Sequence, residues 1–302
     1  PGTLADGRVE LARRQTEMTR LLTRLDTWCN ETAHHPVLRT PLTGEAARRE
    51  SASRKRFKEN LEARLRRYPK SPKDNAFVCD LAFSGELPPL AGRFDYIEQL
   101  ELTSTAASPP GVNRLVELFP KLSVVDIRNY PLREVPPAII ELDALTTLSL
   151  PDCRLTLPQQ TADAIAGMQN LVSLDLGDNP LGNVPALSKL ANLQILRLNN
   201  IGLRATPKGL FDVPGLKSVN LADNVISELP SQFPSTPGDV ATHYNFSGNP
   251  LNPQSLQRLE AYNRARQMRL LEEQAGQVNL NPSPDDSDGS EISVGVEFNR
   301  DS

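Results

Sequence analysis

A regular spacing of leucines in residues 171–200 restricts this chain to a narrow set of folds. The stretch reads LVSLDLGDNPLGNVPALSKLANLQILRLNN, and its first half follows the pattern L-x-x-L-x-L-x-x-N-x-L. Leu174 and Leu176 are two residues apart, so in a strand both side chains point to one side and their neighbours point to the other. Asn179 follows, where its side chain can bond the backbone of the neighbouring turn. One such unit cannot bury its leucines alone, so the pattern requires a stack.

Matching units recur through most of the chain. They begin at Ile97, Leu122, Leu145, Leu171, Leu193, Leu216 and Ala241, and a degenerate unit lies around Val78 to Leu90. The steps between them are 25, 23, 26, 22, 23 and 25 residues, within the roughly 20–29 residues of a leucine-rich repeat. We therefore predict an α/β fold over residues 71–251, a leucine-rich-repeat horseshoe with strands on its concave side and short helices or turns on its convex side.

Helical patterns flank the repeats on both sides. Residues 1–70 predict an N-terminal cap, a hairpin of two helices over about Leu4–Glu31 and Gly44–Tyr68. The second helix carries many basic residues, Arg54 among them, which could touch nucleic acid or an acidic membrane. We favour a solvated face, or one that meets the acidic tail. Residues 252–275 predict a helix that closes the other end of the stack. Residues 276–302, with six acidic residues and one basic one, predict an acidic disordered linker or tail.

Composition excludes several classes of function. The net charge of −4 gives no general case for nucleic acid, and no run of about 18 apolar residues is present to span a membrane. Cys29, Cys79 and Cys153 are far apart, so we expect buried reduced thiols in a reducing compartment. Cys153 takes the place of Asn179 one unit earlier, where we expect it to act as a small, weakly polar substitute. The chain begins at Pro1, so we expect a piece of a longer protein.

The sequence holds no recognisable catalytic constellation. It has no G-x-S-x-G, P-loop, G-x-G-x-x-G or H-E-x-x-H motif, so we expect no cofactor, no metal and no enzyme within these residues. His34 and His35 are neighbours that point in different directions, and we interpret them as part of a solvated loop.

The predicted concave face is the candidate binding surface, because positions three, five and seven of each unit point out of the strands. An acidic first half is followed by a polar second half, with Arg128 and Arg197 as fork-shaped donors. The candidate partner-binding residues are Glu101, Asp126, Arg128, Asp175, Ile195, Arg197, Asn199, Asn220, His243 and Asn245. The alternative is a solvated face without a partner. We expect charge reversal of Asp126 and Asp175 together to weaken capture with little effect on stability.

The order of parts resembles one known family. Helices precede repeats with Leu-Pro turns, and the phrase Ser247–Leu251 (SGNPL) leads into Pro253–Leu259 (PQSLQRL). This resembles the leucine-rich-repeat region of secreted bacterial effectors that carry a C-terminal novel E3 ligase (NEL) domain, in particular the large NEL proteins of pseudomonads. The likeness covers roughly Leu4 to Gln274.

The resemblance implies a role in ubiquitin transfer without the catalytic part. In that family a separate helical domain transfers ubiquitin through a cysteine in a C-x-D motif, which none of the three cysteines here matches. The chain would then be the substrate-recognition, and a candidate autoinhibitory, half of a ligase secreted into the host cytoplasm. Its partners would be a host protein and its own catalytic domain. The alternative is a non-catalytic scaffold that binds a signalling protein.

Overall fold

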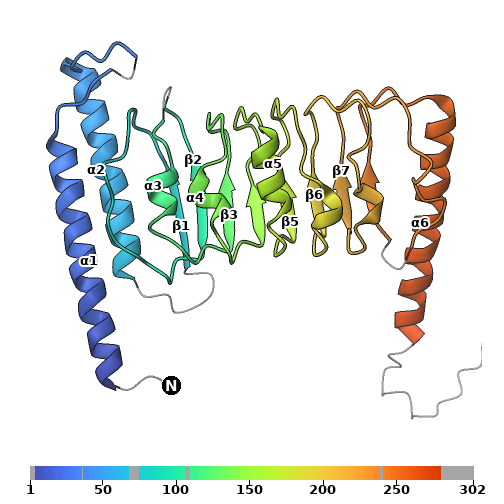
Figure 1. Ribbon diagram of the computed structural model, residues 1–302, viewed down its shortest axis with the longest axis horizontal. Coiled ribbons are helices and arrows are strands. Elements are labelled where there is room, and N and C mark those ends of the chain that lie inside the picture. Colours follow the sequence, from blue (N-terminus) through green and yellow to red (C-terminus); the bar gives the residue numbers. More distant parts are fainter. Residues whose placement is uncertain (1–3, 36, 68–74, 107–108, 239–240, 280–302) are drawn as a thin grey trace, which may run out of the picture.

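The computed structural model describes residues 4–35, 37–67, 75–106, 109–238 and 241–279. In this part of the chain eight parallel strands form one sheet in strict sequence order (Figure 1). The strands are β1 Ala76–Asp80, β2 Gln99–Thr103, β3 Val124–Ile127, β4 Thr147–Ser149, β5 Ser173–Asp175, β6 Ile195–Arg197, β7 Ser218–Asn220 and β8 His243–Asn245. The chain is therefore a leucine-rich-repeat solenoid, as predicted.

The predicted phase of the repeats is confirmed. Strands β2 to β8 each begin two residues after the first residue of their unit, so position four points into the stack. The inward side chains are fully buried, as Leu148, Leu174 and Leu196 illustrate. The degenerate first unit also forms a strand, but β1 begins at Ala76, ahead of the predicted unit at Val78 and not two residues after its first residue.

The strands are followed by a turn that needs a left-handed backbone. The same position of successive units has positive φ at Asn129, Asp152, Asp178, Asn200, Asp223 and Gly248. Asparagine and aspartate tolerate this conformation better than other non-glycine residues, which explains their recurrence. At Gly248 a Cβ atom would run into the carboxylate of Asp223, which favours glycine at this left-handed position.

A buried asparagine after the turn joins neighbouring units. The Asn179 amide donates to the carbonyl oxygens of Leu150, Leu176 and Gly177 at 2.8–3.0 Å. Cys153 occupies the equivalent place, and its thiol lies 3.2 Å from the Ile127 oxygen and 3.4 Å from the Pro151 oxygen. These carbonyls correspond to two of the three that Asn179 contacts, so Cys153 acts as the expected weakly polar substitute.

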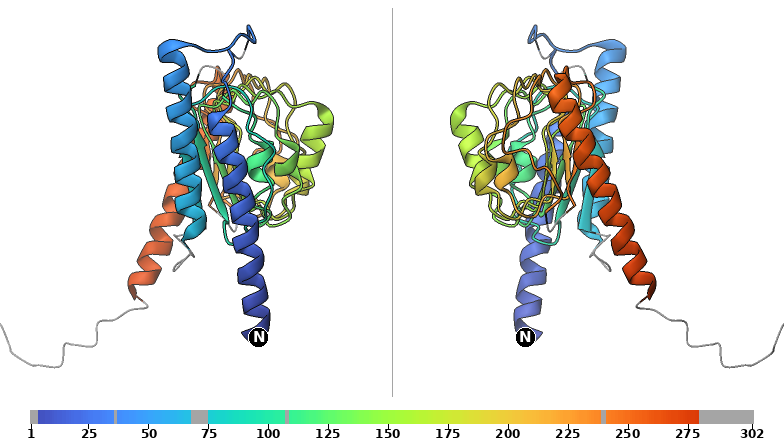
Figure 2. Two further views of the ribbon diagram at one scale, coloured as in Figure 1. Left: turned by 90° about the vertical axis from the view of Figure 1, so that its left-hand side faces the viewer. Right: turned by 90° about the vertical axis from the view of Figure 1, so that its right-hand side faces the viewer.

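Short helices cover the side of the sheet opposite to positions three and five. They are α3 Asn113–Val116, α4 Pro137–Ile140, α5 Gln159–Ala166 and the 3₁₀ turns η2 Leu187–Lys189 and η3 Leu210–Asp212. Figure 2 shows α5 far to one side of the strands. We call the other side of the sheet, which bears positions three, five and seven, the strand face.

The N-terminal cap is a helical hairpin of α1 Leu4–Asn30 and α2 Gly44–Arg66. Trp28 and Phe57 pack edge-to-face on Phe83, with ring centroids 5.1 and 5.4 Å away. The expectation that Arg54 lies on a solvated face is wrong. Its guanidinium is buried over the Trp28 ring at 4.8 Å and bonds Glu50 Oε1 and the Trp28 oxygen, because the hairpin packs around this pair.

The C-terminal cap is the helix α6 Pro253–Asn279. Tyr262 packs on Phe233 and Tyr244, so rings replace leucines at the last repeat. The predicted end of this helix at residue 275 was too early, because residues 276–279, which we had assigned to the linker, continue the helix. Gly276 does not end it, since a glycine inside a helix costs only about 1 kcal/mol. The predicted tail over 280–302 lies outside the described residues. No described helix is long and apolar enough to cross a membrane.

All three cysteines are buried and reduced in the structure. Burial raises the pKa of the Cys79 thiol to about 11 and that of Cys153 to about 12, and it also raises the pKa of Cys29. Since the thiolate is the reactive form, we expect the native chain to resist iodoacetamide at pH 8, whereas the chain unfolded in guanidinium reacts at every cysteine. Mass spectrometry measures this directly, and rapid native labelling of Cys153 would contradict the buried position.

Candidate functional site

The strand register places the predicted surface residues in continuous rows. Position five runs across the sheet as Val78, Glu101, Asp126, Ser149, Asp175, Arg197, Asn220 and Asn245, each paired with the next. Position three runs from Ala76 through Val124 and Ile195 to His243. Neighbouring members of a row lie about 4.8 Å apart. The sheet thus brings together side chains that are more than 160 residues apart in sequence.

The acidic residues of this face are partly neutralised within the sheet. Arg128 Nε and Nη2 bond the two carboxylate oxygens of Asp126 at 2.7 and 2.6 Å. Arg197 lies 3.9 Å from Asp175. The side chains of Asp126 and Asp175 are only 20% and 14% exposed. The expectation that both can be reversed without loss of stability is therefore not supported, because a long cation in place of Asp175 would have to be buried.

Burial raises the pKa of Asp175 above its ordinary value, and the bond from the Gly177 N–H and the charge of Arg197 only partly oppose this. The charged form is thus less favourable in the folded than in the unfolded chain. Stability therefore falls as pH rises from the ordinary aspartate pKa through the raised one.

Asp175→Asn removes this charge and keeps an oxygen for the Gly177 N–H, which Asp175 now bonds at 3.1 Å. We expect the variant to be as stable as the parent chain or more stable at pH 7. The difference should vanish at about pH 3, where Asp175 is protonated. Thermal unfolding at the two pH values measures it. A clear loss of melting temperature at pH 7 alone would mean that the Arg197 pair outweighs desolvation.

The second half of the face is a ladder of amides. Asn245 donates to Oδ1 of Asn220 at 3.1 Å, and Asn220 donates to Oδ1 of Asn199 at 3.3 Å. Asn199 in turn donates to Asp178 at 3.1 Å. This ladder fixes the rotamers of side chains that would otherwise be mobile, so the face is organised before any partner arrives. His243 is exposed at its border, and His34 and His35 belong to the loop between α1 and α2.

The first strands border a pocket that the sequence did not indicate. It has a volume of about 330 Å³. Its lining consists of Asn60 from α2 together with Val78, Cys79, Asp80, Glu101, Leu102, Thr103, Asp126 and Arg128. We call it the acidic pocket, because three carboxylates and one guanidinium line it. Val78, Asp80 and Asn60 were missed, because the degenerate first unit hid the register of β1 and because α2 reaches the face only through tertiary packing.

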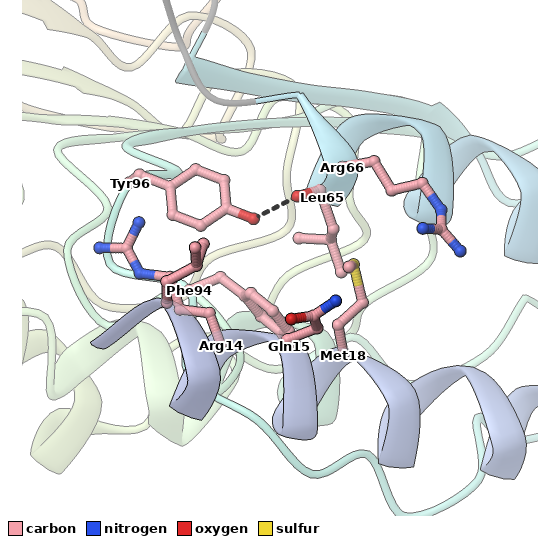
Figure 3. A pocket seen from close by; sticks show the side chains of 8 residues that line it. Arg14, Gln15, Met18, Leu65, Arg66, Phe94 and Tyr96 are labelled. Atoms are coloured by element: carbon pink, nitrogen blue, oxygen red, sulfur yellow. Dashed lines mark hydrogen bonds between the residues drawn. The ribbon is translucent and has the colours of Figure 1, made fainter. Parts of the chain in front are cut away.

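A second hollow of about 330 Å³ lies at the N-terminal cap, between α1 and the end of α2. Figure 3 shows Phe94, Met18 and Leu65 around it, with Tyr96 donating to the Leu65 oxygen at 2.6 Å. Its two arginines are engaged, since Arg14 bonds Glu10 at 2.7 Å and Arg66 bonds Glu62 at 2.6 and 2.8 Å.

Metal chemistry has no support within the described residues, which contain no group of three or more His, Cys, Asp or Glu side chains placed to hold an ion. The strand face instead offers shape, paired charges and fixed amides. Such a surface has the properties needed to recognise another macromolecule.

No protein-family model and no curated protein matches this sequence. Solved structures similar to it include an internalin from Listeria monocytogenes, with 16% identity over 56% of this chain and 47% of that one and a TM-score of 0.43. A leucine-rich-repeat protein from Leptospira interrogans has 22% identity over 63% and 48%, with a TM-score of 0.42. A second Listeria internalin, internalin C2, has 16% identity over 79% and 88%, with a TM-score of 0.45. The chain thus spans about half of the first two.

Proposed function

We propose that this chain binds a protein through its strand face and serves as the substrate-recognition part of an effector ubiquitin ligase of the NEL type. The observation that carries the binding function is the open face itself. Side chains at positions three and five are half-buried or exposed on every strand except at Ser149, although their partners at position four are buried. Repeat arrays use this kind of extended surface for macromolecular partners.

Two properties favour a partner over a merely solvated face. Val124 and Ile195 are apolar and half-exposed in the position-three row, where solubility alone would favour polar residues. Arg128 and the amide ladder are held by hydrogen bonds within the face, so little side-chain entropy is lost when a partner binds. The remaining candidate residues belong to the same face: Glu101, Arg197, Asn199, Asn220, His243 and Asn245.

The ligase role rests on the order of parts rather than on any catalytic residue. A helical hairpin, a repeat array and the closing phrase SGNPL before α6 follow one another as in the NEL effectors. In this proposal the strand face binds a host protein, and a helical domain with a C-x-D motif follows in the parent protein. The gene region after Ser302 tests this part, because a stop codon there would leave a non-catalytic scaffold instead.

The binding part is tested by the double substitution Ile195→Lys and Arg197→Glu. Both residues lie on β6, in the second half of the face, so we expect capture of a host protein identified with the parent chain to weaken at least about tenfold, equivalent to about 1.4 kcal/mol. Glu141→Lys, at the end of the helix α4, which covers the other side of the sheet, is the matched control. Equal capture by all three chains would reject the strand face as the interface.

A further inference from the structure

On the strand face around β1 and β2, an exposed apolar side chain lies next to a carboxylate. Val78 is 61% exposed although it is apolar, and it lies beside Glu101 in the position-five row. Val78 and Glu101 point to the same side of the sheet, about 4.8 Å apart. An apolar shelf thus adjoins a carboxylate at one place on the face.

The charges at this place are not balanced. Asp126 is paired with Arg128, whose guanidinium donates to both carboxylate oxygens of Asp126. Asp80 accepts hydrogen bonds from the N–H and hydroxyl of Thr105, each at 3.1 Å, which orient its carboxylate and supply no opposite charge. Glu101 is exposed and forms no ion pair within the described residues. The acidic pocket therefore carries two carboxylates in excess of its one guanidinium.

We infer that the acidic pocket receives an arginine side chain of the partner protein. The aliphatic stem would lie on Val78 and the guanidinium would meet Glu101, because arginine combines an apolar stem with a planar fork that matches a carboxylate. Asn60 of α2 borders the same pocket and offers an amide oxygen to a further N–H. This inference rests on the proposed function, since it names the chemistry of the partner on the same face.

Two features favour a side chain over a free ion or an anion. The pocket volume of about 330 Å³ suits a long side chain. A hydrated cation would gain nothing from contact with the apolar side chain of Val78. An acidic partner would be repelled by the excess carboxylates. The N-terminal cap would thereby contribute to recognition through α2, in addition to closing the stack.

The experiment uses the full 302-residue chain labelled with ¹⁵N and titrated with acetyl-arginine methylamide. We expect the amide signals of Val78, Cys79, Glu101 and Leu102 to shift in a saturable way, whereas acetyl-citrulline methylamide, which has a neutral head of similar shape, causes much smaller shifts. Glu101→Gln should weaken arginine binding about fivefold or more. Glu141→Gln, which removes the same charge on the other side of the sheet, should leave the binding unchanged.

Several results would overturn the inference. These are equal shifts with citrulline, arginine shifts spread over other exposed carboxylates, or shifts of the same amides by calcium chloride alone. Partner capture separates the two proposals. If the Ile195→Lys and Arg197→Glu double variant still captures the partner protein, the proposed function is refuted, even though this variant still binds arginine. If the Glu101→Gln variant no longer binds arginine but still captures the partner protein, only the inference about the arginine pocket is refuted.

Discussion

Replacement of Asn179 by alanine is expected to lower the free energy of unfolding by about 3–5 kcal/mol. The side chain is only 2% exposed, and its five hydrogen bonds join two units of the stack. Its Nδ2 donates to the oxygens of Leu150, Leu176 and Gly177, and its Oδ1 accepts from the N–H groups of Cys153 and Leu155. Alanine would leave four of these backbone groups buried without this partner, whereas the Gly177 oxygen would keep its bond from the Asp152 N–H at 3.1 Å.

Asn192→Ala is the matched control for this change. The Asn192 side chain is at an exposed residue and donates one bond, to the Gln169 oxygen at 2.9 Å, so we expect a loss below about 1 kcal/mol. Urea unfolding followed by circular dichroism measures both values. Similar losses for the two variants would show that the buried asparagine does not join the units.

Tyr262→Ala should cost about 3–5 kcal/mol, as for other large buried aromatic residues. The ring is 1% exposed, and its centroid lies 5.4 Å from that of Phe233 and 5.5 Å from that of Tyr244. Its hydroxyl also donates to the Thr242 oxygen at 3.0 Å. Because each repeat contacts only its neighbours, the loss should be felt first at the C-terminal end.

Hydrogen exchange distinguishes this local effect from global unfolding. In Tyr262→Ala, amides of β7 and β8 should lose protection before those of β3 and β4. Tyr262→Phe should cost only about 1–2 kcal/mol, since it removes the hydroxyl alone. Met268→Ala, at an exposed position of the same helix, should change little. Uniform loss of protection would mean that α6 does not act as a terminal cap.

The sequence was sufficient to predict the stack, because the fold depends on a periodic requirement. Every unit must supply an inward apolar residue, such as Leu174, so the spacing of these residues predicted the start of seven strands. The first strand was misplaced because its unit has Phe77 and Cys79 where consensus units have leucines. The burial of Arg54 was missed because the sequence does not reveal that Glu50 pairs with it and binds the Ser84 N–H.

The rows of the strand face were predicted from the same phase, but the energetics of their residues were not. The environment of Asp175 depends on Arg197 in the next strand, which only the register brings close to it. The acidic pocket lies beyond any pattern in one repeat, because Asn60 comes from α2 and Val78 from the degenerate unit. Contacts between an irregular cap and a regular array leave no periodic signal.

Site-specific photo-crosslinking tests most directly whether the strand face binds a protein. A benzophenone amino acid is placed at Ser173 or Ser218 on the strand face, or at Asp163 or Ser188 on the helical side. We predict that one and the same host protein is crosslinked from Ser173 and Ser218 and from neither of the other positions. Crosslinking from Asp163 and Ser188 alone would place the partner on the helical side and contradict the account.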